Sequence, residues 1–326
     1  MYRNVKYSPA YTLVPTYECF NRCEYCNFRV DPSQDVWLTL EQAEARLQAL
    51  RGQGICEILI LSGEVHPESK RRDAWLERIE GLCELAIALG FLPHTNVGPL
   101  KYEEMLRLKA VNVSMGLMVE QVSPELMQTV HRHAPSKRPE LRLQQLEWAG
   151  ELQIPFTTGL LLGIGETEGD RRDTLEAIAQ IHQRWGHIQE VIIQPYSLGN
   201  SQILNAPGFP LEQLPNAIAQ ARCALPDDIT LQIPPNLVRY PDLLVACLEA
   251  GARDLGGICP RDEVNPDYPH PNLQALQEVL STCGWYLYPR LPVYPQYEGW
   301  LNPDLQSRVQ QWRNAFTLLS PVQPNL

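Results

Sequence analysis

The chain has 326 residues, with 44% of them hydrophobic, and carries a net charge of −11 from 38 acidic and 27 basic side chains. This balance argues against nucleic acid as a partner, because phosphate binding depends on clustered Lys and Arg. No run approaches 18 consecutive apolar residues, and the first residues lack an apolar signal region. We therefore expect no membrane span and a cytoplasmic location.

Short apolar runs alternate with longer amphipathic stretches along most of the chain. The expected strands are Thr12–Val14, Glu57–Leu61, Leu92–Asn96, Val111–Met115, Phe156–Leu162, Glu190–Gln194, Thr230–Ile233 and Asp254–Ile258. The clearest helical patterns cover Leu40–Leu50, Trp75–Leu89, Asp170–Trp185 and Leu305–Phe316. Gly52, Gly54, Gly90 and Gly186 stand where a helix ends in a left-handed residue. Strands that alternate with helices predict an α/β fold, a single-domain (β/α)8 TIM-type barrel, with a doubly wound open sheet as the alternative.

The last part of the chain differs from the rest. Its stretch from Trp285 to Trp300 carries three prolines and four tyrosines and precedes the last expected helix. We interpret residues 1–259 as the barrel and residues 260–326 as a cap packed on it.

Unusual residues follow the expected strands, where a barrel places its chemistry. These segments are the cysteine-rich stretch after the first strand, Ser62–His66, Gly163–Thr167, Gln194–Tyr196, Pro234–Asn236 and Gly256–Cys259. The sequence therefore predicts a site at the carboxyl ends of the strands.

Three of the nine cysteines, Cys19, Cys23 and Cys26, form a CxxxCxxC pattern. A [4Fe–4S] cluster held by three thiolates leaves one iron open for a small molecule, and a cluster with S-adenosylmethionine (SAM) supports radical chemistry. Structural zinc sites use paired CxxC spacings, and no second pair exists here. Cys259 is disfavoured as a fourth ligand, because it would close the open iron.

Around this motif the chain resembles the radical SAM superfamily. Tyr25 stands at the aromatic position before the last cysteine, which in the superfamily helps to seat the adenine. Ser62-Gly63-Glu64 is similar to the Gly-Gly-Glu motif that contacts the methionine amine, with serine at its first position.

Two further features extend this resemblance. The segment 159–166, which includes Gly163 and Glu166, is similar to the GxIxGxxE motif that supports the adenine. Arg142 precedes the fifth strand, where related enzymes place an arginine against the SAM carboxylate. A surface arginine is the alternative interpretation of that residue.

A narrower resemblance is to the CofG-type subunit of FO synthase, where FO is 7,8-didemethyl-8-hydroxy-5-deazariboflavin. It rests on the segments 137–142, 146–150, 154–159, 186–194, 234–237, 254–258 and 264–266. The resemblance implies a radical SAM lyase. A 5′-deoxyadenosyl radical abstracts hydrogen from 5-amino-5-(4-hydroxybenzyl)-6-(D-ribitylimino)-5,6-dihydrouracil, the ring closes and ammonia leaves. It also implies a CofH-type partner that supplies the substrate and a flavodoxin or ferredoxin as reductant.

Tyr196 and His66 are the candidates for moving protons during the loss of ammonia. Polar strand-end residues suited to uracil and ribityl groups are Asn96, Asn112, Ser114, Thr158, Gln194 and Asn236. For all of these, an ordinary polar residue of the barrel is the alternative. The basic segment Lys70–Arg72 is a candidate docking site for the reductant.

Two other functions stay open from the sequence. One is a different radical SAM enzyme, CofH-like, futalosine-processing or biotin-synthase-like. The other is a non-catalytic iron–sulfur electron carrier, for which four thiolates would be expected.

Overall fold

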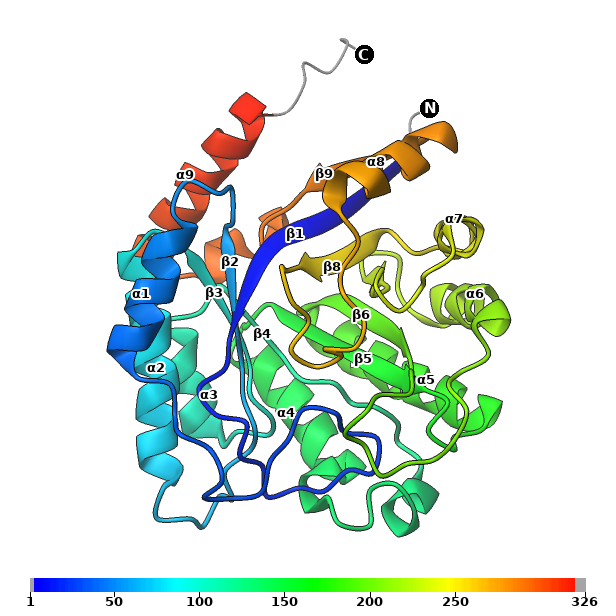
Figure 1. Cartoon of the computed structure of the whole chain (residues 1–326), viewed down its shortest axis with the longest axis horizontal. Helices are drawn as coiled ribbons and strands as arrows, with labels where there is room; N and C mark the ends of the chain where they lie inside the picture. Colours follow the sequence, from blue (N-terminus) through cyan, green and yellow to red (C-terminus); the bar gives the residue numbers. More distant parts are fainter. Residues whose placement is uncertain (1–2, 320–326) are drawn as a thin grey trace.

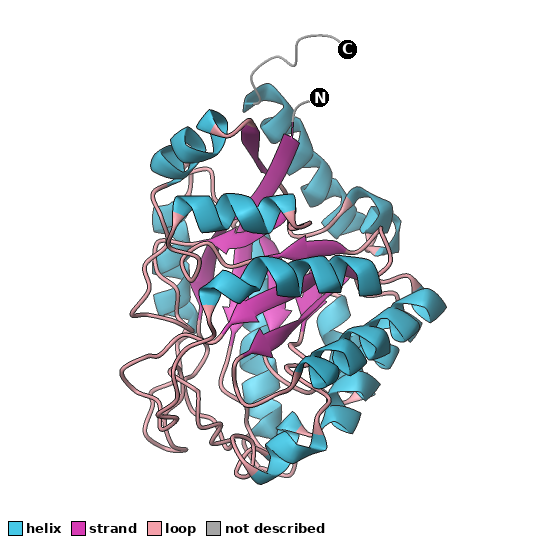
Figure 2. Ribbon diagram, turned by 90° about the vertical axis from the view of Figure 1, so that its right-hand side faces the viewer, coloured by secondary structure: helices cyan, strands magenta, loops and turns pink. Residues whose placement is uncertain are grey.

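Eight parallel strands close into a barrel surrounded by helices (Figures 1 and 2) in this computed structural model, which describes residues 3–319 and the side chains of residues 3–317. Neighbouring strands follow the order β2-β3-β4-β5-β6-β7-β8-β1, and pairing of β1 with β2 closes the ring. This closure confirms the predicted barrel and excludes the doubly wound open sheet.

The elements have the following bounds. The strands are β1 (Arg3–Leu13), β2 (Glu57–Leu61), β3 (Leu92–Asn96), β4 (Ser114–Gly116), β5 (Phe156–Leu162), β6 (Ile188–Pro195), β7 (Thr230–Gln232), β8 (Asp254–Ile258) and β9 (Trp285–Pro289). The α-helices are α1 (Leu40–Leu50), α2 (Arg72–Ala88), α3 (Tyr102–Lys109), α4 (Pro139–Glu151), α5 (Glu168–Trp185), α6 (Leu214–Ala224), α7 (Pro241–Glu249), α8 (Leu273–Thr282) and α9 (Pro303–Leu319). Short 3-10 turns are η1 (Pro124–Gln128), η2 (Pro135–Lys137), η3 (Leu211–Gln213) and η4 (Pro295–Trp300).

Local capping chemistry sets the helix ends that the sequence predicted. Helix α5 begins at Glu168 because the Thr167 hydroxyl accepts a hydrogen bond from the Asp170 amide (3.1 Å), while the Asp170 carboxylate accepts one from the Thr167 amide (2.7 Å). The same helix ends at Gly186, which has a φ of 65°. The other three predicted cap glycines also have positive φ.

Strand β4 begins three residues later, and ends one residue later, than predicted. The Asn112 side chain donates to the Leu108 carbonyl (2.9 Å) and accepts from the Thr95 hydroxyl (2.7 Å). These bonds hold residues 110–113 as a turn after α3, so the ladder starts only at Ser114.

Strand β1 is longer than predicted because of a partner that lies far away in the chain. Its first half pairs in parallel with β9, from Arg3 opposite Trp285 to Tyr7 opposite Pro289. The two strands extend beyond the barrel beside α8, at the upper right of Figure 1. A strand within a proline- and tyrosine-rich segment has no periodic pattern of its own, so sequence reasoning missed β9.

After β9 the chain crosses the amino-terminal end of the barrel. The Pro292 carbonyl accepts hydrogen bonds from Ser114 Oγ (2.6 Å) and Gln189 Nε2 (2.9 Å). Apolar residues of this segment and of α9 form a second buried cluster with the bases of β2, β3 and β4: Cys56, Leu92, Val113, Leu291, Val293, Tyr294, Tyr297, Leu301, Leu305 and Val309. The segment therefore closes one end of the barrel and leaves the other end open.

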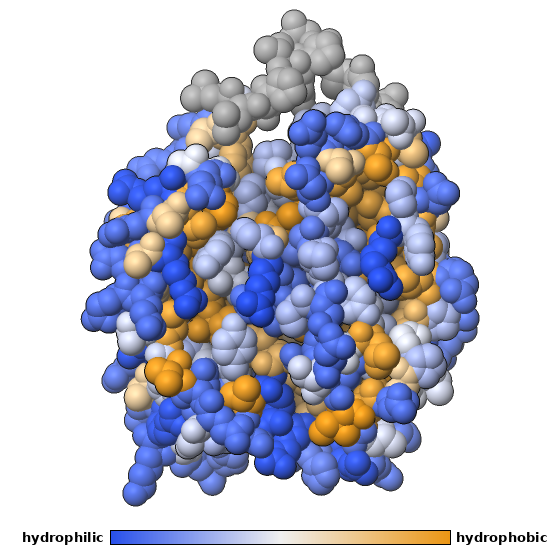
Figure 3. Space-filling view, viewed as in Figure 1, coloured by the Kyte–Doolittle hydropathy of each residue, from blue (hydrophilic) through white to orange (hydrophobic). Residues whose placement is uncertain are grey.

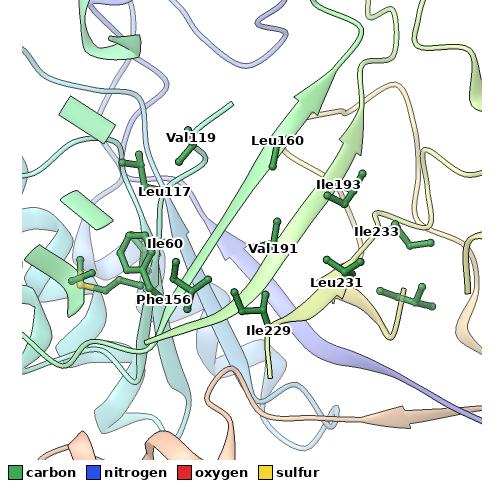
Figure 4. Close-up of a cluster of buried hydrophobic side chains, with 14 of the residues drawn as sticks. Ile60, Leu117, Val119, Phe156, Leu160, Val191, Ile193, Ile229, Leu231 and Ile233 are labelled. Atoms are coloured by element: carbon green, nitrogen blue, oxygen red, sulfur yellow. The ribbon is translucent and has the colours of Figure 1, made fainter. Parts of the chain in front are cut away.

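The main core lies between the strands and the helices (Figure 4). In β6, Val191 and Ile193 belong to this core, whereas Glu190, Ile192 and Gln194 face the barrel interior. This period-two alternation places charged and polar residues of the strands inside the barrel.

The face shown in Figure 3 is mostly hydrophilic, with apolar side chains in small separate groups. Within residues 3–319, no helix has both the length and the hydropathy needed to cross a bilayer.

Candidate functional site

A cavity of about 360 Å³ opens at the carboxyl ends of the strands and continues into the barrel. Its mouth is formed by the segment between β1 and α1, here called the cluster loop (residues 14–39), and by the residues that follow β2. All three cysteines of the CxxxCxxC pattern line this cavity. The predicted location of the site is therefore where the structure has its cavity.

The cluster loop is anchored on both sides by main-chain hydrogen bonds. The Cys19 amide donates to the Val30 carbonyl (3.1 Å) and the Phe20 amide to the Glu64 carbonyl (3.0 Å). The Cys26 amide donates to the Cys23 carbonyl (3.1 Å), which folds the end of the motif into a turn. The thiols are thus held by a fixed loop.

Burial raises the pKa of the Cys19 thiol to about 12 and that of Cys23 to about 11. Since metal ligands must be deprotonated, iron binding here has to displace protons. Among residues 3–319, no three Cys, His, Asp or Glu side chains converge as they would around a single ion. Thiolates are the ligands that iron–sulfur clusters use, so the side chains of this loop are chemically suited to such a cluster.

Beside the thiols, Glu64 lies at the centre of a buried polar network. Its carboxylate accepts hydrogen bonds from Asn21 Nδ2 (2.9 Å), from the Ser136 hydroxyl and from Arg142 Nη2 (3.4 Å). Arg142 is only 2% exposed and also donates to the carbonyls of Ser136 and Met118. Arg142 is therefore not a surface arginine, and the cavity wall carries this buried basic side chain beside the partly buried carboxylate of Glu64.

Small residues allow this close packing. A Cβ on Gly63 would lie 2.1 Å from the Glu18 carbonyl oxygen, and a Cβ on Gly98 would lie 2.4 Å from the Glu64 side chain. Ser62 is buried, donates to the Gly63 carbonyl (2.9 Å) and accepts from Trp75 Nε1 (3.0 Å). The serine is thus a hydrogen-bonded support for the glycine that follows it.

Gly163 and Glu166 form a turn after β5. The Glu166 carboxylate accepts from the amides of Gly163 (2.8 Å) and Ile164 (2.9 Å) and from Arg171 Nε (2.8 Å). Neither Gly163 nor Glu166 is among the residues that line the cavity, whereas Leu161 is. The carboxylate braces its own loop.

Comparison with known proteins identifies the family. The Radical SAM superfamily model matches residues 13–178, about half of the chain. The chain is 66% identical over 307 residues to the 7,8-didemethyl-8-hydroxy-5-deazariboflavin synthase of Trichormus variabilis, covering 94% of this chain and 90% of the relative. It is 62% identical over 309 residues to the synthase of the same name from Thermosynechococcus vestitus, covering 95% and 98%. The chain belongs to this synthase family.

Two solved structures share the fold. The FeFe-hydrogenase maturase HydG from Carboxydothermus hydrogenoformans matches with a TM-score of 0.74 at 20% identity, over 98% of this chain and 79% of that one. Methylornithine synthase (PylB) matches with a TM-score of 0.66 at 16% identity, over 91% and 86%. Membership of the radical SAM superfamily implies a [4Fe–4S] cluster and SAM as cofactors.

Tyr25, between the second and third cysteines, lines the cavity. Its hydroxyl makes a 2.9 Å hydrogen bond with His131 Nε2, and burial raises its pKa. The ammonium group of Lys137 lies 5.8 Å from the centre of the Tyr25 ring. Lys137 also forms a 2.5 Å ion pair with Glu120. The loop between β4 and α4 therefore fixes this side of the mouth.

The two residues predicted to move protons are placed differently. Tyr196 is buried, lines the cavity and donates to the Leu204 carbonyl (3.3 Å). His66 is exposed, lies outside the cavity lining, packs on Phe20 and accepts from the Glu68 amide (3.1 Å). The structure thus brings only Tyr196 into the site.

The polar strand-end residues also divide into two groups. Asn96, Gln194 and Asn236 line the cavity. The other three, Asn112, Ser114 and Thr158, do not, and their side chains bond to the protein around them.

The basic segment Lys70–Arg72 is not the free cluster that the sequence suggested. Arg72 is 4% exposed and donates to both oxygens of Glu104, at 2.8 and 2.7 Å. Arg71 pairs with the buried Glu18 (2.7 Å). Two of its three charges are therefore used to hold the fold.

Sequence reasoning missed the charged residues at the closed end of the cavity, Glu57, Glu190 and Arg290. Glu57 and Glu190 could have been noticed in the sequence, because a glutamate within an otherwise apolar strand is unusual. Nothing local marked Arg290, which comes from the segment after β9.

Proposed function

We propose that Cys19, Cys23 and Cys26 hold three irons of a [4Fe–4S] cluster and that the fourth iron is left for SAM. Support comes from three thiols facing one cavity on an anchored loop. Cys259 also lines the cavity, but its thiol is held by the Thr12 hydroxyl (3.6 Å). When bound, the cluster and SAM supply reductive generation of a carbon radical.

The pair of Glu64 and Arg142 beside the thiols suits the amino-acid end of SAM. Glu64 would accept hydrogen bonds from the ammonium group, and Arg142 would pair with the carboxylate. Ser62 and Gly63 hold the Glu64 main chain close to the cluster loop, and Tyr25 borders the adenine side. Gly163 and Glu166 act indirectly, by shaping the turn after β5.

We infer that the reaction is formation of FO from the tyrosine–uracil adduct with loss of ammonia. The observation that carries this is the 66% identity over 94% of the chain to a 7,8-didemethyl-8-hydroxy-5-deazariboflavin synthase. In this reaction the barrel excludes water and orients one substrate carbon toward the mouth. Tyr196, inside the cavity, is the proposed proton-transfer residue, whereas His66 would act only through solvent at the rim.

The proposed partners are a CofH-type subunit that supplies the adduct and a flavodoxin or ferredoxin that supplies the electron, in the cytoplasm. We keep residues 1–259 as the proposed barrel and 260–326 as the proposed cap.

The test is an anaerobic assay of the reconstituted chain with SAM, reductant and adduct, followed by FO fluorescence. We expect FO, 5′-deoxyadenosine and methionine to form together. A cluster whose spectrum ignores added SAM, with no FO formed, would refute the proposal.

A further inference from the structure

The closed end of the cavity carries an unusual concentration of buried charge. We call Glu57, Glu190, Asp254, Arg290 and Tyr294 the barrel floor; all lie near the amino-terminal ends of the strands or in the segment after β9. Glu57, Glu190 and Arg290 line the same cavity as the cluster-loop thiols. The barrel floor and the cluster loop therefore lie at opposite ends of the same cavity.

One guanidinium pairs with two of the three carboxyl groups on the floor. Arg290 pairs with Glu190 (2.5 Å) and with Asp254 (2.5 Å). Glu190 also accepts from the hydroxyls of Tyr294 (2.9 Å) and Thr157 (3.1 Å). Burial raises the pKa of Glu190 to about 7 and also raises that of Glu57, although Arg290 opposes both shifts.

Buried charged groups of this kind lower the stability of a barrel. The interiors of these barrels are normally filled by branched apolar side chains, and buried charges destabilise a fold unless they are fully paired. Anchoring the segment after β9 requires Asp254 or Glu190, but it does not require Glu57, which makes no hydrogen bond to Arg290 among those of the described residues. The excess of carboxyl oxygens therefore points to a ligand.

Between floor and mouth, the apolar Leu59, Ile192 and Leu255 line the cavity wall together with His94 and Gln232, which lie opposite Leu59 and Ile192 in the sheet. At about 3.3 Å per residue, Glu57 lies roughly 13 Å along β2 from Leu61, the residue before the Ser62–Glu64 motif. A bound molecule reaching from the mouth to the floor thus passes a layer of mixed apolar and polar side chains and ends among carboxyl acceptors.

The chemistry of the floor selects donor-rich ligands. All three nitrogens of Arg290 already donate within the protein, to Asp254, Glu190 and the Leu291 carbonyl. A uracil edge needs donors as well as acceptors, and a phenol ring needs apolar contacts rather than carboxyl groups. A chain of hydroxyl groups, which donates repeatedly, matches the carboxyl oxygens that remain.

We propose that the barrel floor binds the polyhydroxyl chain of the deazaflavin substrate and product, with Glu57 and Glu190 as acceptors for its hydroxyl groups. The proposal rests on the function given above and assigns these two glutamates as specificity-determining residues. The reacting part of the substrate then lies toward the mouth, next to SAM.

The test uses the cluster-loaded chain with SAM and without reductant, titrated with FO and with a 10-methyl analogue that has the same ring system but no polyol. Binding is measured by fluorescence polarisation. We expect the wild type to prefer FO. Glu57→Gln and Glu190→Gln should each weaken FO binding by about tenfold and leave the analogue unchanged, which is about the loss expected for one hydrogen bond.

Glu151→Gln is the matched control, because this glutamate is exposed and accepts only a surface bond from Tyr102 (3.1 Å). Thermal unfolding checks each variant. If Glu190→Gln fails to fold once Arg290 loses a partner, Glu57→Gln decides the question.

Two outcomes separate this proposal from the function on which it rests. Equal loss of both ligands, or of neither, in folded variants of a wild type that forms FO would overturn the floor assignment alone. Absence of FO formation by the reconstituted wild type would overturn the function and the floor assignment with it.

Discussion

Replacing Glu64 by glutamine tests the proposed SAM site directly, because the change removes one charge and keeps the shape of the side chain. Glu64 accepts hydrogen bonds from Asn21 (2.9 Å) and Ser136 and lies 3.4 Å from Arg142. Arg142 keeps its bonds to the carbonyls of Ser136 and Met118, so we expect the free energy of unfolding to fall by only about 1 kcal/mol.

The effect on SAM should be larger. A hydrogen bond between an ammonium group and a carboxylate is worth about 1.5–3 kcal/mol, so the Kd for SAM should rise about 10- to 150-fold. The assay is a SAM titration of the reconstituted variant, with the cluster absorbance as the check that iron is loaded. Glu151→Gln is again the control. Unchanged SAM affinity in a fully loaded Glu64→Gln protein would refute the assignment of Glu64.

Three further predictions concern the cluster, the fold and pH. Alanine at any of the three cluster-loop cysteines should abolish both iron loading and FO formation, whereas alanine at the exposed Cys283 should retain both; iron assay and FO fluorescence decide. Thr167→Ala removes the cap of α5 and should cost about 1 kcal/mol in urea denaturation, and a stability equal to the wild type would contradict the capping role. Burial lowers the pKa of His94 to about 3, so its ring stays neutral in the fold while the unfolded chain takes up a proton below pH 6.5. Its contribution to stability is therefore present above that pH and lost as pH falls, by about 1.4 kcal/mol between pH 7.5 and 5.5. His94→Gln should lose less stability over this range, and an identical pH profile would show that His94 carries no shifted pKa.

Much of the barrel could be predicted because its signals are local. Four strands, among them Glu57–Leu61 and Phe156–Leu162, have the predicted bounds, and so does the helix Leu40–Leu50. Apolar runs, cap residues and left-handed glycines act within a few residues of chain, so the sequence displays them directly. The cluster loop is likewise a local pattern, since its three cysteines lie within eight residues.

The exposure of individual side chains, and the residues with which they pair, depended on parts of the chain far away in sequence. The sequence placed Arg72 in an exposed basic segment and left a surface position open as the alternative for Arg142, but Glu104 and Glu64 pair with these arginines inside the protein. His66 follows β2 closely, yet the direction of its loop leaves it outside the cavity. Which way a loop turns depends on what it packs against, and neighbouring residues do not specify that.

The sequence by itself therefore determined the barrel, the thiols for a cluster and the family resemblance, because each depends on short-range chemistry. The tertiary structure decided what lies at the far end of the cavity. Arg290 meets Glu190 and Asp254 only because β9 pairs with β1 and carries the following segment across the barrel. These contacts join residues far apart in the chain, so only the folded chain brings the charged floor and the thiols into one cavity.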